Sequence, residues 1–78
     1  MVEIIKEHRN KKVTVGEAKR LYPNCNFLLV DTIEINNNTV KGIIYAISKT
    51  PETLKELVIL EDELQENGYK TLIGGEYT

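Results

Sequence analysis

Three side chains could together support nucleophilic catalysis: the single cysteine Cys25, the single histidine His8, and Asp31. A thiol next to an imidazole that a carboxylate orients is a common arrangement for a cysteine nucleophile. Cys25, however, lies in the Pro-Asn-Cys-Asn turn at 23–26, where no cationic neighbour in the sequence favours the reactive thiolate. One cysteine and one histidine are also too few for a structural zinc site. We therefore expect no enzymatic activity, no metal and no cofactor.

A second candidate for chemistry is the stretch 41–45, which begins Lys-Gly and ends at Tyr45. In RNA-recognition strands, Lys-Gly precedes two aromatic residues at alternating positions on which bases stack. Here Ile43 occupies the first aromatic position, and Glu3 stands where the partner strand needs an aromatic side chain. The net charge of −2 also opposes binding to phosphate. These features disfavour nucleic acid as a partner, and RNA binding is the least favoured of the functions that the sequence suggests.

The composition is that of a small soluble domain. The chain has 78 residues, of which 41% are hydrophobic and 28% are charged, so we expect one domain over residues 1–78. Its longest apolar stretch, at 43–47, is far shorter than the roughly 20 residues that cross a bilayer. The N-terminus has no signal-peptide pattern, and one cysteine cannot form an internal disulfide. These features predict a cytoplasmic protein that does not bind membranes.

Charge is distributed unevenly along the chain. Residues 1–20 carry six cationic side chains against three carboxylates, a balance of +3, whereas residues 21–78 carry four against nine, a balance of −5. Lysine outnumbers arginine eight to two, which is typical of AT-rich coding sequences. This composition favours a phage or mobile-element accessory protein with separate basic and acidic surfaces.

Local patterns predict the secondary structure. A capping box at Thr14 and Glu17 starts a short helix, and Thr50-Pro51 starts a longer helix that Gly68 ends. The expected elements are a strand at 2–7, a polar turn at 8–12, a helix at 14–22, a hairpin of strands at 27–35 and 39–48, a helix at 51–67 and a strand at 69–74.

This order, β-α-β-β-α-β, predicts an α+β fold of the ferredoxin-like type, with a small antiparallel sheet and both helices on one face. If the first strand and the first helix do not form, a ββαβ core with an irregular N-terminal arm remains.

The hairpin register decides which face of the sheet is buried. A two-residue loop at Asn37-Asn38 would pair Ile35 with Val40 and Glu34 with Lys41. The expected core face is then Phe27, Leu29, Asp31, Ile33, Ile35, Val40, Gly42, Ile44 and Ala46. Asp31 suits this face only at a bulge or at the rim of the sheet. The opposite face would offer an open apolar interaction surface of Leu28, Val30, Ile43, Tyr45 and Ile47. A register slip of one residue would exchange the two faces.

The end of the second helix is the other candidate interaction surface. It gathers negative charge where the helix dipole disfavours it, and an isoleucine is expected to face solvent beside that charge. The residues of this acidic helix end are Ile59, Glu61, Asp62, Glu63 and Glu66. It is either a solvated acidic face or a patch that docks a basic surface. That basic surface could belong to another protein or to the +3 segment at 1–20 of a second copy.

These observations favour a non-enzymatic interaction or regulatory protein, for example an inhibitor of a host enzyme. Its expected partner is another protein, a second copy of the chain in a homodimer, or both. The alternative is a regulatory domain that binds a small molecule, because ferredoxin-like domains often bind such ligands at dimer interfaces.

Overall fold

A long hairpin, β3 (Asn26–Ile35) and β4 (Thr39–Ser48), forms the centre of the computed structural model, which describes residues 2–77. Around it lie β1 (Val2–Ile4), β2 (Lys12–Thr14) and β5 (Thr71–Gly75), which complete an antiparallel sheet of five strands. Helix α1 (Val15–Leu21) follows β2, and α2 (Leu54–Glu66) follows the short 3-10 helix η1 (Pro51–Thr53). The protein is therefore a small α+β domain, as the sequence predicts.

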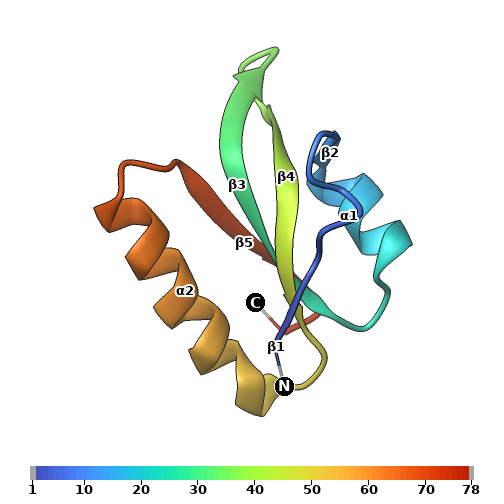
Figure 1. The fold of residues 1–78 in the computed structure, drawn as a ribbon. Helices are drawn as coiled ribbons and strands as arrows, with labels where there is room; N and C mark the ends of the chain where they lie inside the picture. Colours follow the sequence, from blue (N-terminus) through green and yellow to red (C-terminus); the bar gives the residue numbers. More distant parts are fainter. Residues whose placement is uncertain (1, 78) are drawn as a thin grey trace.

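The strand order is β1-β4-β3-β5, with β2 also paired to β4 on the side that β1 occupies. The two helices lie on opposite faces of this sheet (Figure 1). Ala18 of α1 belongs to one buried cluster and Leu57 of α2 to the other. The predicted ferredoxin-like order is therefore not confirmed, and the prediction that both helices share one face is wrong. The ββαβ core is present, but its N-terminal arm is regular and adds two strands and a helix.

The hairpin turn differs from the expected two-residue loop. Ile35 pairs with Thr39, so three asparagines form the turn, and Asn36 and Asn37 have positive φ values of 54° and 66°. Asparagine adopts this left-handed conformation more readily than most residues. The predicted pairs of Ile35 with Val40 and of Glu34 with Lys41 are therefore wrong by one residue.

Two irregularities in the β3–β4 ladder set the faces of the sheet. Asp31 has a positive φ of 53° and is exposed at a register shift between Val30 and Ile33, as expected for a bulge. The second shift pairs Leu28 with Ala46 but Leu29 with Ile44, so Tyr45 is an extra residue on β4. Because of it, Ala46 joins the cluster under α2 rather than the one under α1.

The helix boundaries follow the capping signals. Thr14 Oγ1 accepts a hydrogen bond from the Glu17 N–H at 3.1 Å, and the capping box is complete. Ala18 belongs to the buried cluster under α1, and Val15 and Tyr22 pack against that cluster. Thr50 caps η1 rather than α2, and Gly68 follows α2 with a φ of +87°. Within the described residues, neither helix has the length and hydrophobicity to cross a membrane.

Candidate binding groove

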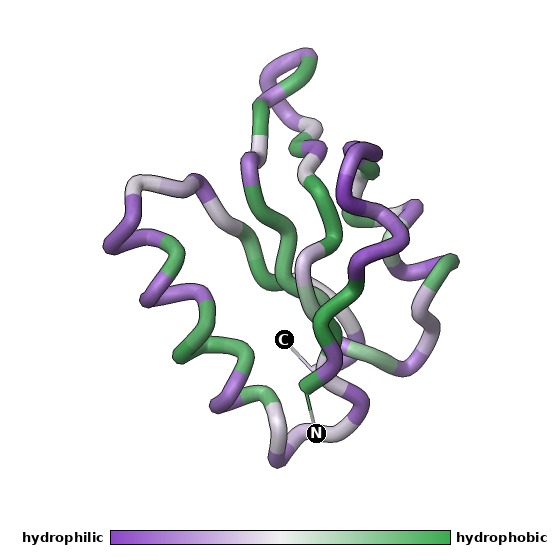
Figure 2. Tube along the Cα trace, viewed as in Figure 1, coloured by the Kyte–Doolittle hydropathy of each residue, from purple (hydrophilic) through white to green (hydrophobic). Residues whose placement is uncertain are grey.

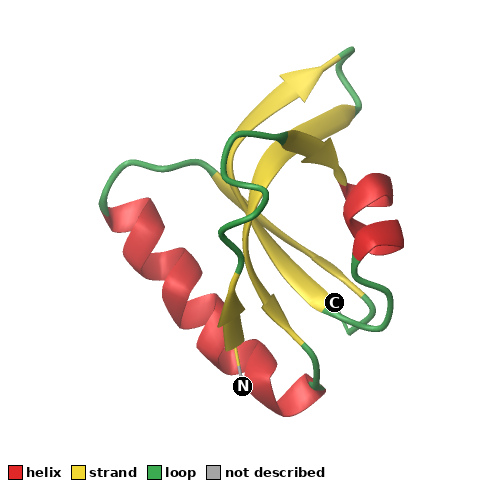
Figure 3. Cartoon of the chain, turned by 45° about the vertical axis from the view of Figure 1, so that its right-hand side comes forward, coloured by secondary structure: helices red, strands yellow, loops and turns green. Residues whose placement is uncertain are grey.

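A groove opens beside β4 where the edge of the sheet is interrupted. β1 pairs with residues 46–48 and β2 with residues 41–43, so residues 6–11 leave the sheet between them (Figure 3). The Ile5 N–H still donates to the Tyr45 carbonyl at 2.7 Å, and the Arg9 N–H donates to the Lys6 carbonyl at 3.3 Å as the chain turns. The interruption brings the cationic residues of this turn next to the hairpin.

The groove has a volume of about 380 Å³ and combines an apolar floor with a charged rim. Val30, Ile43 and Tyr45 supply side chains from the α2 side of the sheet. Lys6 and Arg9 line the groove from the turn. The complete lining is Ile4, Ile5, Lys6, Arg9, Val30, Asp31, Ile43, Ile44 and Tyr45. Among the described residues, none from α2 lines the groove.

A second hollow, of about 410 Å³, adjoins the groove at Asp31, which lines both. Lys12 and Lys70 line this second hollow. Lys12 Nζ donates to the Asp31 main-chain carbonyl at 2.9 Å, which holds this ammonium group beside the bulge. Together the two hollows are lined by four cationic side chains against the carboxylate of Asp31, a local balance of +3. In Figure 2 the connection from β1 to β2 is mostly hydrophilic, whereas the hairpin is mostly hydrophobic away from its turn.

The predicted open sheet face is only partly open. Leu28 is fully buried and Val30 is 7% exposed, because α2 packs over them through Leu57. Ile47 is 2% exposed and lies on the opposite face, in the cluster under α1, since the extra residue Tyr45 reverses the alternation. The prediction of a single open apolar surface is therefore wrong. Val30, Ile43 and Tyr45 nevertheless come together in the groove.

The acidic helix end divides into two parts. Asp62, Glu63 and Glu66 are exposed, and Ile59, at 57%, is the most exposed of the large hydrophobic side chains among the described residues. Glu61 instead turns toward β5, where its Oε2 accepts a hydrogen bond from Thr71 Oγ1 at 3.1 Å. Glu61 thus helps to fasten α2 to the sheet and is not part of the outward surface.

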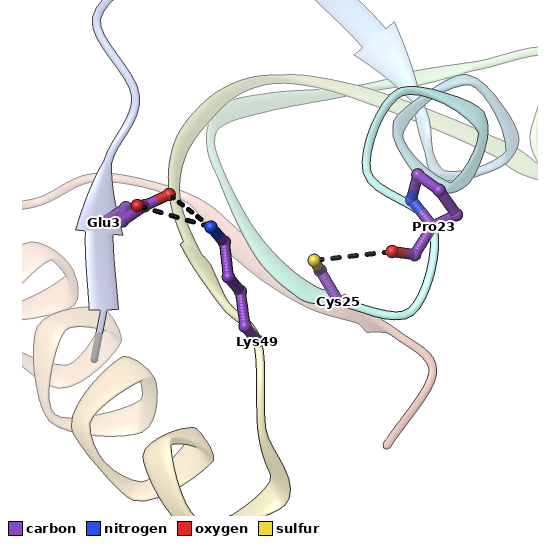
Figure 4. Close-up of polar contacts among 4 residues, drawn as sticks. All are labelled: Glu3, Pro23, Cys25 and Lys49. Atoms are coloured by element: carbon purple, nitrogen blue, oxygen red, sulfur yellow. Dashed lines mark hydrogen bonds and ion pairs between the residues drawn. The ribbon is translucent and has the colours of Figure 1, made fainter.

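Each of the three side chains that could have formed a nucleophilic site makes another contact or lies beside the groove. The Cys25 thiol donates to the Pro23 carbonyl at 3.5 Å (Figure 4). His8 packs edge-on against Tyr22, with 5.8 Å between ring centroids. The Asp31 bulge lies at the groove, near Lys12. Within residues 2–77, no group of three or more histidine, cysteine or acidic side chains could hold a metal ion.

On the α1 face, the pKa of Tyr22 is raised above its ordinary value of 10.0, first by burial and then by the nearby carboxylates of Glu7 and Glu3. A raised pKa in the folded state favours the neutral phenol. The contribution of Tyr22 to the free energy of unfolding is therefore complete below about pH 10 and is lost as pH rises through the folded-state pKa. We predict that the wild type loses more unfolding free energy than Tyr22→Phe between about pH 9 and about pH 11. Urea unfolding at both pH values measures this difference, and equal losses would contradict the prediction.

No family model, curated protein or solved structure matches the chain. Function is therefore inferred from the geometry of the groove and of α2.

Sequence reasoning did not identify Lys6, Arg9 and Lys70 as site residues. The signal that could have found the first two is the +3 balance of residues 1–20.

Proposed function

We propose that this chain is a non-enzymatic binding protein that recognises a protein partner through the groove. The observation that carries the proposal is a groove in which the partly exposed side chains of Ile43 and Tyr45 lie beside the cations Lys6 and Arg9, with Val30 buried at its base. An apolar floor gains free energy when a partner removes it from water. The cationic rim attracts a negatively charged partner and orients it as it approaches.

The chemistry of the groove indicates the kind of surface that it binds. An aliphatic or aromatic side chain of the partner would fill the floor, while flanking carboxylates would lie against Lys6 and Arg9. Since the groove is small, it would hold one anchoring side chain, and the rest of the interface would form around it. That the partner is a host enzyme, as the phage-like composition suggests, stays a prediction, and so does the cytoplasmic location.

The test is a comparison of partner capture by two charge-reversed variants. We expect Lys6→Glu/Arg9→Glu to retain about tenfold less partner protein than the wild type, because like charges then meet across the rim. Lys19→Glu/Arg20→Glu changes the net charge equally, but its exposed side chains lie on α1, on the other face of the sheet. It should capture partner as the wild type does. Equal losses in both variants would attribute capture to net charge and contradict the proposal.

A second candidate function is binding of a small organic anion, which the volume of the groove favours. Ligand pockets usually enclose between about 300 and 1,000 Å³, and the groove, at about 380 Å³, lies at the lower end of that range. A carboxylate with an apolar body would suit the same floor and rim. A thermal-shift screen with aliphatic and aromatic carboxylates tests this function. Stabilisation of the wild type, but not of Lys6→Glu/Arg9→Glu, would support it over protein binding.

A further inference from the structure

We infer that one occupant of the groove is the outer face of α2 from a second copy of this chain, so that copies associate head to tail. Here the outer face of α2 means Glu56, Val58, Ile59, Asp62 and Glu63. The inference rests on the proposed function in one respect, because it uses the same groove. It adds the identity of a partner.

The outer face of α2 presents an apolar centre surrounded by carboxylates. Ile59 is 57% exposed and its neighbour Val58 is 40% exposed. Residues three or four positions apart are neighbours on a helix surface, so Glu56, Asp62 and Glu63 surround Ile59. Lys55 also adjoins it and is the one cation within α2. Two adjacent exposed aliphatic side chains in this setting suit an apolar groove as an anchor.

The groove has the complementary pattern. Its centre is apolar, and the groove with the adjoining hollow carries a balance of +3 from Lys6, Arg9, Lys12 and Lys70 against Asp31. These cations and the carboxylates of α2 do not neutralise each other within one copy. In the described part of the chain, the single ion pair joins Lys49 Nζ to Glu3 Oε2 at 3.4 Å (Figure 4). Contact between two copies would bring the opposite charges together.

This contact is heterologous when the groove and the helix of one copy engage two different neighbours. A heterologous contact does not close in a dimer; it continues into a ring or an open chain of copies. A homodimer that pairs two sheet faces would need Leu28 and Ile47 at the surface, but both side chains are buried. Head-to-tail association uses surfaces that the single chain leaves exposed.

Two variants, each defective in one patch, test the inference. The groove variant is Lys6→Glu/Arg9→Glu, and the helix variant is Ile59→Ala/Asp62→Asn/Glu63→Gln. Lys6 and Arg9 are exposed, and so are the three substituted positions on α2. Both variants should therefore fold. Circular dichroism and melting temperature check this. Lys19→Glu/Arg20→Glu is the charge-matched control for the groove variant.

We expect the weight-average mass of the wild type, measured by sedimentation, to rise from 8.9 kDa by about twofold or more as its concentration reaches ~1 mM in ~50 mM salt. At ~500 mM salt the association should weaken by about tenfold, since salt screens exposed charges. Each patch variant alone should stay at the mass of one chain, while the control behaves as the wild type.

A mixture of the two patch variants gives the decisive result. The intact helix of the groove variant can enter the intact groove of the helix variant, and growth must then stop at two chains. A mixture that forms such a pair supports the inference. A wild type that stays at 8.9 kDa, a patch variant that still associates, or a mixture without pairs would overturn it. Such a result would leave the proposed function standing if partner capture still depends on Lys6 and Arg9, so the two failures are distinguishable.

Discussion

Leu57→Ala is expected to lower the free energy of unfolding by about 2–5 kcal/mol. Leu57 is fully buried and is the residue through which α2 enters the cluster of Leu28, Val30 and Ala46. The truncation removes apolar contacts and leaves a cavity that the sheet can only partly fill. A chain of this length has a total stability of about 4–12 kcal/mol, so the variant loses a large share of it. Urea unfolding followed by circular dichroism measures the loss.

The matched control is Ile59→Ala, two residues further along the same helix. Ile59 is 57% exposed, so its truncation should change the unfolding free energy by no more than about 0.5 kcal/mol. The contrast separates the buried side of α2 from its outer face. Equal losses in the two variants would mean that α2 packs on the sheet in another orientation.

Gly42→Ala is expected to cost about 1–3 kcal/mol, the usual penalty for forcing extra volume into a packed site. A Cβ atom at this position would lie 2.9 Å from Leu29 Cβ and 2.9 Å from Thr32 Cγ2, closer than such atoms approach in proteins. Gly42 stands opposite the bulge at Asp31, which brings Thr32 over it. The substitution should therefore also disturb the floor of the groove.

Gly16→Ala is the control for Gly42→Ala. The nearest atom to an added Cβ at Gly16 is Thr14 Oγ1 at 3.9 Å, and the residue lies in the first turn of α1. Alanine favours the helix over glycine, so this variant should be unchanged or gain up to about 1 kcal/mol. Chemical denaturation of both variants tests the pair. A Gly42→Ala protein as stable as Gly16→Ala would contradict the close approach at the bulge.

Local signals in the sequence predict several elements correctly, because short-range physics determines them. The capping box at Thr14 and Glu17 depends on residues three positions apart, and the hairpin follows from two β-branched strands around an asparagine turn. Asp31 could be assigned to a bulge because a carboxylate does not fit a core face. The register could not be predicted, because the turn holds three asparagines rather than two and because the extra residue Tyr45 reverses the alternation further along β4.

The candidate site was predictable only in part, for the same reason. Val30, Ile43 and Tyr45 lie on one face of the predicted hairpin. They are the three of the five residues of the expected open sheet face that line the groove. Lys6 and Arg9 reach it because β1 and β2 pair with different parts of β4. That interruption depends on contacts far apart in the sequence. Within residues 2–14 the sequence indicates the polar turn at 8–12 but not the second pairing with β4 that follows it.

Binding through the groove and through the outer face of α2 is the basis of both proposals. Its most direct test is a backbone amide NMR spectrum of the labelled wild type at concentrations from ~20 μM to ~1 mM. We predict that the signals of residues 6–9, 43–45 and 56–63 move together, while those of α1 stay in place. Movement confined to α1 or to β5, or no movement at any concentration, would contradict the claim.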